Sequence, residues 1–325
     1  MSSTKDAPRR SAQEWLDEWE TFLSDQTDGG RNADAYAHGT MQMSPRGWLD
    51  CDDTLFIKPR HAIMGIEEHV TRWPGFNATD EFPKGRPILR HEKPEGNPNY
   101  NGNFGGHLAN LAFYCNDRAA GPLVGGAQFT RWDNLYVRAN ALGTFAFTIG
   151  RGSTRCSSRG LNLTGGSNRH RQGGGLHVNQ SIGIYVESPT LHDFVTPIHI
   201  NRSQSVTIQN AFIEEGGAIR LTNSSNCHIR GLTWREGPQD GVLFDLTGDK
   251  GGNTIQGVLR GTSGPFLYVD RAGMVRRLDV KDWINSSTND GTTFEVRTTW
   301  RRRLVRRWKK RIWKMEVTTS NGEEE

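Results

Sequence analysis

Apolar and polar residues alternate in short runs along the middle of the chain. Residues 205–234, SVTIQNAFIEEGGAIRLTNSSNCHIRGLTW, place two β-branched runs on either side of a Glu-Glu-Gly-Gly turn, and the pattern begins again at His228-Ile229. Alternation of this kind between turn residues is typical of β-strands. It predicts either a hairpin or one unit of a repeat.

Two series of apolar positions indicate that the unit repeats, because each advances in steps of 21 to 29 residues. The first series is Leu111, Leu135, Leu161, Ile184, Ile208, Ile229, Ile255 and Leu278, and the second is Phe147, Leu176, Ile198, Ile219, Phe244, Leu267 and Phe294. A strand-turn-strand repeat without a helical pattern or a leucine-rich signature predicts an all-β solenoid, a parallel β-helix of about eight or more coils over residues 38–298. The composition agrees, since 38 glycines and only 34% hydrophobic residues favour many short strands over one thick globular core.

The first 37 residues contain a predicted amphipathic helix over about 11–25. Ser11 and Glu14 have capping-box spacing. The apolar face consists of Trp15, Leu16, Trp19, Phe22 and Leu23. This helix either caps the open N-terminal end of the solenoid or attaches the protein to a larger assembly.

Residues 299–325 contain a predicted basic amphipathic helix. Nine basic residues and no acidic one lie between Trp300 and Met315, so with a net charge of +4 the rest of the chain carries 4 − 9 = −5. The apolar face would hold Trp300, Leu304, Trp308, Ile312 and Met315, with Arg306 and Arg307 among the basic residues on the other faces. Three uses remain open: packing on the last coil or on sister subunits, an anionic membrane surface, or nucleic acid or another acidic partner.

The stretch from 39 to 65 carries a more specific pattern. It contains Gly39-Thr40, the alternating Met41 and Met43, Pro45-Arg46-Gly47, the strand Leu55-Phe56-Ile57, and Ile63-Met64-Gly65. This order resembles the opening segment of the pectate-lyase-like right-handed β-helix superfamily, and the resemblance extends over about residues 39–297. The superfamily includes polysaccharide lyases, glycosidases and adhesive bacteriophage spikes. The resemblance therefore implies a right-handed coil and a glycan-related function, most like a phage tailspike or fibre-type virion protein that forms a homotrimer.

Residues 66–105 depart from the superfamily pattern, in which an acidic, aromatic-poor preamble often leads directly into the first strand. The segment is rich in Pro, Gly and Asn. We expect a strand near Pro87 to Leu89 between long loops that project as a functional excursion.

Equivalent residues in successive coils form columns, because coils stack about 4.8 Å apart. The outward column of the second series is polar and carries both charge signs, an inventory that can hold hydroxylated or acidic sugars, although an ordinary solvated sheet face is also polar. It consists of Thr148, His177, His199, Arg220, Asp245, Tyr268 and Glu295. At the strand exits, Asn179, Asn201 and Thr222 predict a structural amide ladder.

Two carboxylates form the candidate catalytic pair. Glu215 and Glu236 each follow an apolar anchor by seven residues. They are therefore expected to stack in adjacent coils about 5 Å apart, the separation that retaining glycosidases use. Solvated turn carboxylates would have the same spacing. Trp234 would offer a face on which a sugar stacks and Arg235 would stabilise charge, whereas a lyase is disfavoured because no Asp-rich cluster stands on neighbouring coils.

The remaining signals narrow the chemistry. Cys51, Cys115, Cys156 and Cys227 match neither zinc nor redox spacing, so we expect buried thiols, no metal and no cofactor. The N-terminal stretch does not resemble a signal peptide, and no window approaches the roughly 18 apolar residues of a membrane span. We expect a virion protein that is assembled in the host cytoplasm, or otherwise a protein that is kept in the cytoplasm or exported without a cleaved leader.

Three functions follow from these patterns. The first is a virion β-helix protein, a tailspike or fibre component, that binds a host-surface polysaccharide and contacts other virion proteins through its N-terminal helix. The second is a polysaccharide-cleaving glycosidase. The third is a non-enzymatic scaffold or decorating protein that acts through residues 300–315.

Overall fold

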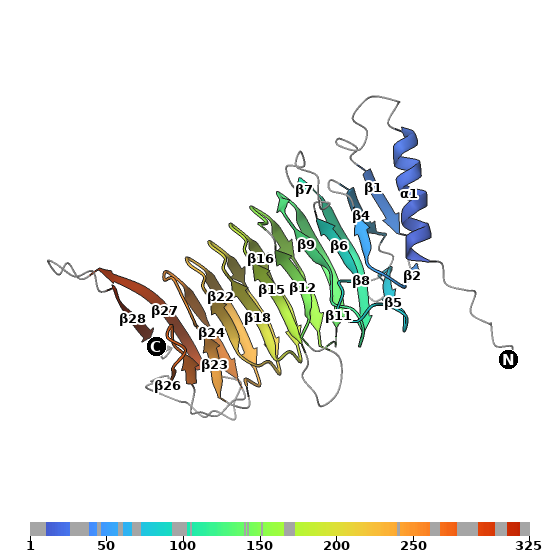
Figure 1. Ribbon diagram of the computed structural model, residues 1–325. Helices are drawn as coiled ribbons and strands as arrows, with labels where there is room; N and C mark the ends of the chain where they lie inside the picture. Colours follow the sequence, from blue (N-terminus) through green and yellow to red (C-terminus); the bar gives the residue numbers. More distant parts are fainter. Residues whose placement is uncertain are drawn as a thin grey trace, which may run out of the picture.

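The structure is a computed structural model that describes the greater part of the chain. The described residues are 11–26, 39–43, 47–57, 61–66, 73–92, 103–104, 106–139, 141, 143–150, 152–165, 173–238, 241–260, 267–277, 292–302 and 311–318. They form a parallel β-solenoid of about seven turns with one short N-terminal helix, α1 (Ala12–Gln26) (Figure 1). The all-β solenoid expected from the repeat is confirmed, with about one turn fewer than predicted.

Two long sheets run along the solenoid, and each complete coil contributes strands to both. Sheet B has ten strands in the order β26-β25-β23-β21-β18-β15-β12-β9-β6-β3. Their bounds are β3 (Leu55–Ile57), β6 (Leu89–Glu92), β9 (Leu123–Gly125), β12 (Phe145–Gly150), β15 (Gly174–Asn179), β18 (Thr196–Asn201), β21 (Ile219–Thr222), β23 (Val242–Asp245), β25 (Leu267–Val269) and β26 (Val275–Arg277).

Sheet A has sixteen strands and covers the rest of the coil. They are β1 (Gly39–Met43), β2 (Trp48–Cys51), β4 (His61–Gly65), β5 (Gly75–Ala78), β8 (His107–Asn116), β11 (Arg131–Ala139), β13 (Ser157–Arg159), β14 (Asn162–Thr164), β16 (Tyr185–Glu187), β17 (Thr190–His192), β19 (Thr207–Gln209), β20 (Phe212–Glu214), β22 (His228–Arg235), β24 (Thr254–Arg260), β27 (Thr292–Arg302) and β28 (Arg311–Thr318). A separate pair joins β7 (Asn103–Phe104) to β10 (Ala127–Gln128).

Left-handed backbone conformations make the bends of each coil. In the bend within sheet A, Asn110 and Asn134 adopt positive φ, and Asn134 Nδ2 donates to Asn110 Oδ1 at 3.0 Å. Gly160 follows in the same column, and a Cβ there would lie 2.7 Å from Asn134 Oδ1. Asparagine and glycine tolerate this conformation better than other residues. The column of Asn110, Asn134 and Gly160 therefore consists of residue types that adopt this conformation at low cost.

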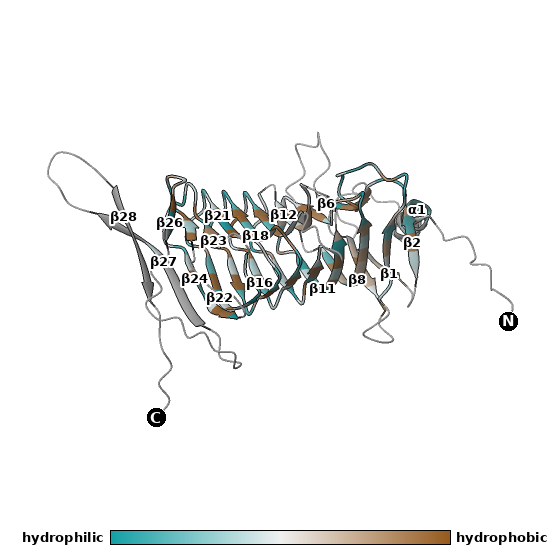
Figure 2. Ribbon diagram, turned by 90° about the horizontal axis from the view of Figure 1, so that it is seen from below, coloured by the Kyte–Doolittle hydropathy of each residue, from teal (hydrophilic) through white to brown (hydrophobic). Residues whose placement is uncertain are grey.

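The interior of the coil is apolar, with a polar ladder at one corner. Hydrophobic and hydrophilic positions alternate along the strands (Figure 2), and the interior includes the fully buried Trp132 and Trp234. At the exit of sheet B, the backbone N–H of Ser181 donates to Ser203 Oγ at 3.2 Å, and that of Ser203 donates to Ser224 Oγ at 3.2 Å. These buried hydroxyls satisfy backbone groups where the chain leaves the sheet ladders. The four cysteines are free and buried, as expected.

The strand register confirms most of the predicted alignment and corrects part of it. Leu111 pairs with Leu135, and Phe147 pairs with Leu176. Ile208, however, pairs with Val186 in the preceding coil. The predicted partner, Ile184, lies two residues before Val186. Residues two apart on a strand face the same way, so the sequence alone does not distinguish neighbouring inward anchors.

The last predicted coil does not form as expected. Phe294 lies in β27, which pairs with β24 of sheet A in antiparallel orientation, and Leu278 lies outside the described residues. The antiparallel strand closes the hydrogen-bonding edge of the solenoid, because it runs back along the last coil.

Helix α1 packs on the first coil. Trp15 and Leu16 are buried in the core, and the Trp15 ring meets the ring of Phe76 edge-on at 6.3 Å. The predicted helix is thus confirmed, and it lies at the N-terminal end of the solenoid as a cap would (Figure 1). The side chains of Phe22 and Leu23 lie outside the described residues, and attachment to other proteins stays a prediction.

The segment from 66 to 105 contributes more to the solenoid than the sequence suggested. The expected strand is present as β6 in sheet B, and β5 adds a second strand that pairs with β2 and β8 of sheet A. Residues 67–72, 93–102 and 105 lie outside the described part. Most of the remaining segment is therefore part of a coil and not an excursion from it.

The C-terminal segment differs from the predicted helix at both of its described ends. Residues 292–302 and 311–318 are the strands β27 and β28, which pair in antiparallel orientation with Trp300 opposite Trp313. The alternating apolar residues Trp313, Met315 and Val317 also suit a strand, since period two and period 3.6 overlap over short stretches. Leu304, Arg306, Arg307 and Trp308 lie outside the described residues, so the partner-binding role of residues 300–315 stays a prediction.

The burial of Trp234 gives a test of the coil interior. We expect Trp234→Ala to lower the free energy of unfolding by about 3–5 kcal/mol, because it removes a large buried ring and leaves a cavity. Thr233→Ala on the same strand, whose side chain is half-buried, should change it by less than about 1 kcal/mol. Urea unfolding followed by circular dichroism measures both, and equal effects of the two substitutions would contradict the assigned strand orientation.

Candidate functional site

The outward column predicted on sheet B exists over five coils. Thr148 pairs with His177, and His177 with His199. His199 then pairs with Arg220, and Arg220 with Asp245. All five side chains are half-buried, while the residues before and after each one are buried in the core. The sequence therefore located these residues correctly, and their role in binding stays a prediction.

Three flat rings gather on this column. The rings of Phe145 and His177 lie 4.3 Å apart at an interplanar angle of 22°, and those of His177 and His199 lie 5.0 Å apart at 20°. The Phe145 ring also lies 6.0 Å from that of His199, so each ring contacts the other two. Gly174 makes this possible, because a Cβ there would lie 2.1 Å from the Phe145 ring. Phe145 was not among the site residues predicted from the sequence, although it lies only three residues before Thr148.

An amide ladder borders the rings and fixes one imidazole. Asn201 Nδ2 donates to Asn179 Oδ1 at 3.2 Å, and Thr222 Oγ1 donates to Asn201 Oδ1 at 3.0 Å, so the predicted ladder is confirmed. His199 Nε2 lies 2.9 Å from Thr222 Oγ1. Because that hydroxyl already donates its only proton to Asn201, His199 must donate from Nε2. Its Nδ1 then remains an acceptor.

Both stacked imidazoles are neutral at pH 7. Burial, together with a smaller contribution from the nearby His199, lowers the pKa of His177 from 6.5 to about 4. Burial also lowers the pKa of His199 to about 4, with an added contribution from Arg220. Two imidazolium rings 5.0 Å apart would repel each other, whereas neutral rings stack. The column therefore presents the edges of stacked, uncharged rings.

A charged pair ends the column. Arg220 Nε lies 3.9 Å from Asp245 Oδ2, with side-chain exposures of 43% and 22%. The other carboxylate oxygen of Asp245 accepts from the backbone N–H of Thr247 at 3.0 Å and from its hydroxyl at 2.7 Å. The carboxylate is thus held in place, and the partly exposed guanidinium has donors to offer a ligand.

Two residues predicted for this column do not belong to it. The register shifts between Val242 and Phe244, so Tyr268 pairs with the inward Phe244 and Val269 follows Asp245. Glu295 lies in β27 of sheet A, opposite Gln256. The spacing of apolar residues does not reveal a register shift within a strand or a last strand that runs in the opposite direction. These two residues could therefore not be placed from the sequence.

The carboxylate pair lies where the strands of sheet A end. Glu214 pairs with Arg235, and the backbone N–H of Glu215 donates to the Arg235 carbonyl at 3.1 Å, which places Glu215 and Glu236 in adjacent coils as expected. Arg235 lies 3.1 Å from Glu214 and 3.8 Å from Glu236. His192 Nδ1 lies 2.9 Å from the second oxygen of Glu214. This corner is thus a row of polar contacts that joins side chains of three successive coils.

Trp234 is wrong as a sugar-stacking residue. Its side chain is fully buried and meets the Phe244 ring edge-on at 6.2 Å. The alternation of β22 turns Leu232 and Trp234 inward and leaves Thr233 and Arg235 outside.

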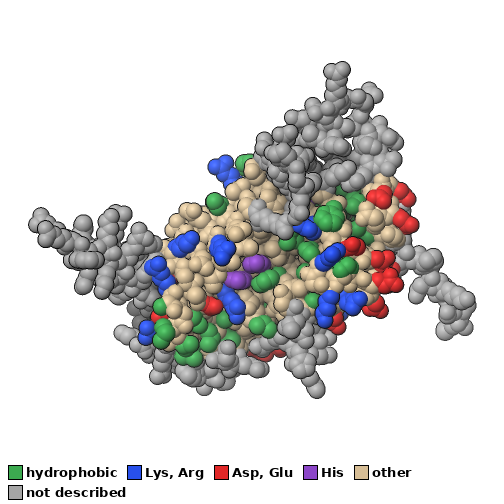
Figure 3. Space-filling model, viewed as in Figure 1, with side chains coloured by type: hydrophobic (Ala, Val, Ile, Leu, Met, Phe, Trp, Pro, Cys, Tyr) green, Lys and Arg blue, Asp and Glu red, His purple; other side chains and the backbone are tan. Residues whose placement is uncertain are grey.

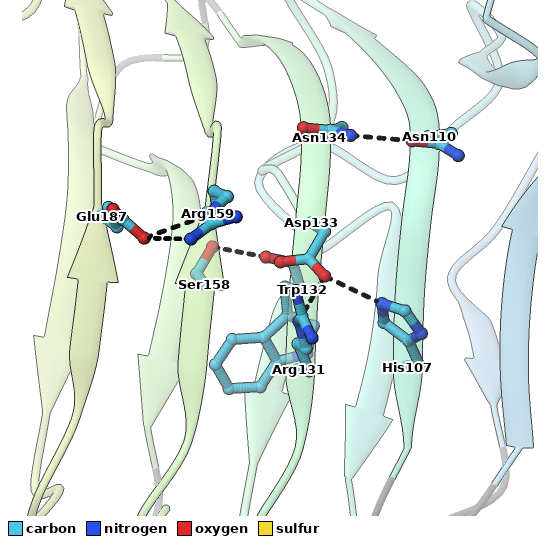
Figure 4. Close-up of polar contacts among 9 residues, drawn as sticks. All are labelled: His107, Asn110, Arg131, Trp132, Asp133, Asn134, Ser158, Arg159 and Glu187. Atoms are coloured by element: carbon cyan, nitrogen blue, oxygen red, sulfur yellow. Dashed lines mark hydrogen bonds and ion pairs between the residues drawn. The ribbon is translucent and has the colours of Figure 1, made fainter. Parts of the chain in front are cut away.

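A second charged cluster lies on sheet A and was not predicted. Figure 4 shows Asp133 between two partners, with Oδ2 3.2 Å from His107 Nε2 and 2.5 Å from Arg131 Nε. In the next two coils, Arg159 and Glu187 approach to 2.9 Å. His107 and Asp133 are 26 residues apart in the sequence, and Arg159 and Glu187 are 28 apart. Because these separations differ from coil to coil, such pairs can be predicted only when the length of each coil is known.

Side chains of different charge are distributed unevenly over the described surface. Figure 3 shows imidazole side chains near the middle of the visible face, basic side chains along its length, and acidic side chains mainly toward the α1 end. Among the described residues, no three His, Cys, Asp or Glu side chains gather where they could hold a metal ion. No helix in that part of the chain is long and apolar enough to cross a membrane.

The stacked imidazoles predict a pH dependence of stability. Because their pKa values are lower in the folded protein than in the unfolded chain, the unfolded chain binds more protons as the pH falls from 6.5 to 4. Stability is therefore full above about pH 6.5, and after allowance for solvent screening we expect the pair to lose roughly 2–4 kcal/mol between about pH 7.5 and 5. Urea unfolding at both pH values should show a smaller loss for His177→Gln/His199→Gln, and an unchanged loss would contradict the assignment.

Comparison with known proteins gives likenesses of shape only. No family model matches the sequence, and no curated protein matches it. Among solved structures, ORF18 of Geobacillus virus E2 is 11% identical, with 89% of this chain and 70% of that one covered and a TM-score of 0.31. DFA-IIIase from Arthrobacter chlorophenolicus A6 is 11% identical, with 83% and 84% covered and a TM-score of 0.44. WceF of Pantoea stewartii, described as a glycan biofilm modifying enzyme with a bacteriophage tailspike-like parallel β-helix fold, is 10% identical, with 97% and 54% covered and a TM-score of 0.37. At these identities and TM-scores, none of these likenesses assigns a function to this chain.

Proposed function

We propose that this chain is a glycan-binding β-helix protein, and that the outer face of sheet B binds a host-surface polysaccharide. The observation that carries the proposal is the ring platform of Phe145, His177 and His199, which presents the edges of stacked, uncharged rings on a rigid sheet. Sugar rings offer an apolar C–H face beside polar hydroxyls. A face that binds them needs ring surfaces and hydrogen-bonding groups side by side.

The groups around the rings supply the polar half of this chemistry. Asn179, Asn201 and Thr222 form a column two residues further along each strand than the imidazole column. Arg220 and Asp245 end the imidazole column with donors and acceptors. Hydroxyl groups both donate and accept, so a mixed border of amides, a guanidinium and a carboxylate matches them.

The scaffold limits the entropic cost of binding. Backbone hydrogen bonds to both neighbouring coils hold the strands, and the ring contacts and the amide ladder hold the side chains before a ligand arrives. Groups that are already ordered lose little freedom on binding, which raises affinity for a given set of contacts.

The biological setting is part of the same proposal. The resemblance of residues 39–65 to the opening segment of the pectate-lyase-like superfamily supports a tailspike or fibre-type virion protein and a homotrimer. In that setting α1 would cap each subunit and contact other virion proteins, and the basic residues between Trp300 and Met315 would contact a sister subunit or another acidic partner.

Removing the phenyl ring of the platform tests the binding face. We expect Phe145→Ala to weaken binding to a surface polysaccharide at least about 10-fold, because it removes a ring face that contacts both imidazoles; this corresponds to about 1.4 kcal/mol. Calorimetric titration with lipopolysaccharide-derived and capsular polysaccharides from candidate host bacteria measures the effect.

The matched control for this experiment lies on sheet A. Phe212 is also half-buried and also lies near an imidazole, with its ring 6.0 Å from that of His192. Phe212→Ala should leave binding unchanged. If no polysaccharide binds, or if both variants weaken binding equally, the proposal for sheet B is wrong.

A second candidate function is glycoside hydrolysis at the corner where the strands of sheet A end. The observation in its favour is that Glu215 and Glu236 occupy adjacent coils beside Arg235. In a retaining mechanism one carboxylate attacks the sugar and the other donates a proton to the leaving group.

Substitution of both carboxylates tests this second candidate. If the corner is catalytic, Glu215→Gln/Glu236→Gln should lower the rate of polysaccharide cleavage by a factor of about 100 or more. Release of reducing ends from the bound polysaccharide measures the rate. Cleavage that persists in the double variant, or a wild-type protein that binds without cleaving, would exclude this role for the pair.

A further inference from the structure

The outward column of sheet B continues beyond the predicted stripe toward the N-terminal end. Thr148 pairs with Leu123 in the preceding coil, and Leu123 pairs with Arg90. Arg90 in turn pairs with Phe56 in β3. One unbroken column therefore runs from Phe56 to Asp245 through eight strands of the sheet.

Phe56 and Arg90 form a second platform at the far end of this column. Phe56 is 58% exposed, although it lies between the buried Leu55 and Ile57. The Arg90 guanidinium carbon lies 5.3 Å from the centre of its ring. A large ring left exposed on a strand, with a cation beside it, can bind the C–H face and the hydroxyls of a sugar, the role proposed above for the ring platform.

Between the two platforms, the column carries only half-buried side chains. Leu123 and Thr148 occupy the column there, and both are half-buried. In the neighbouring outward column, Gly125 and Gly150 pair with each other where Asn179 and Asn201 stand further along. Glycine has no side chain, so nothing projects from this column at these two positions, although both glycines are buried.

The distance between the platforms follows from the coil spacing. Four strand-to-strand steps separate Phe56 from His177. At about 4.8 Å per step this is roughly 19 Å, the length of about four sugar units if each unit in an extended chain spans one strand spacing. A ligand must be long and narrow to reach both platforms.

We infer that the glycan bound by sheet B is a linear polysaccharide that lies along the solenoid axis and reaches both the Phe145–His177–His199 platform and the Phe56–Arg90 platform. The inference rests on the proposed glycan binding and adds the shape of the ligand and a second binding site. It has a consequence that glycan binding alone does not have: affinity must depend on the length of the oligosaccharide.

Length-fractionated oligosaccharides test this inference. The probe is a partial acid hydrolysate of the surface polysaccharide, separated by gel filtration into fractions of two to about ten sugar units, and titrated against the full-length protein. We expect affinity to rise between about three and six units, where a chain first spans roughly 19 Å, and to rise little beyond that. Phe56→Ala should weaken the binding of the long fractions at least about 10-fold and leave that of the shortest fractions unchanged.

Phe129 provides a matched control. It is also 58% exposed and also has a guanidinium over its ring, that of Arg155 at 5.8 Å. It lies in a bend with positive φ, outside the strands that carry the column. Phe129→Ala should not change the binding of any fraction.

The outcomes separate this inference from the proposal on which it rests. Binding that is independent of length, or insensitive to Phe56→Ala, would overturn the lengthwise ligand and leave glycan binding at the ring platform intact. Equal losses for Phe56→Ala and Phe129→Ala would also overturn it, because the effect would not belong to the column. If no fraction and no intact polysaccharide binds, both proposals fail.

Discussion

The hydrogen bonds between successive coils are the constraint on which the rest of this structure depends. They fix equivalent residues at about one strand spacing along the axis, so that any side chain repeated in register becomes part of a column. Inside the coil, columns of aliphatic and aromatic residues fill the core. Outside it, the same rule produces the stack of His177 on His199 and the ladder from Asn179 to Thr222. The core and the candidate site therefore both result from the stacking of equivalent residues in successive coils.

This constraint also explains why imidazoles on an outer face are neutral. A ring that lies against neighbouring rings loses much of its water, although it belongs to the surface of the sheet. His177 and His199 lie against each other, and Phe145 lies beside both. Removal of water disfavours the protonated form, which lowers the pKa of both imidazoles. On sheet A the opposite arrangement occurs, because Asp133, Arg159 and Glu187 alternate in sign from coil to coil and remain in charged pairs.

The sequence was sufficient to predict the position of residues in regularly repeating coils. It was not sufficient to predict the position of residues at irregularities that occur once. The positions of His177, His199, Arg220 and Asp245 followed from counting between apolar anchors, because these coils have nearly equal lengths. Tyr268 and Glu295 were placed wrongly, since the first lies after a register shift and the second in a strand that reverses direction. The inward orientation of Trp234 was already implied by the alternation Leu232-x-Trp234, but its position two residues before Glu236 suggested a site. The column from Phe56 to Thr148 required the strand pairings themselves, because residues 66–105 give no regular spacing.

The two ends of the solenoid are closed by segments that do not belong to the repeat. A stack of coils leaves an apolar cross-section and unpaired strand edges at each end, and both invite association with other chains. At the N-terminal end, α1 covers the cross-section with Trp15 and Leu16. At the other end, Thr298 of β27 exchanges backbone hydrogen bonds with the last coil, accepting from Gly252 at 2.8 Å and donating to Asn253 at 2.9 Å. Because α1 covers apolar side chains at one end and β27 pairs with a strand edge at the other, the solenoid does not need another chain to complete these contacts, and its long outer faces are free to bind a partner along its length.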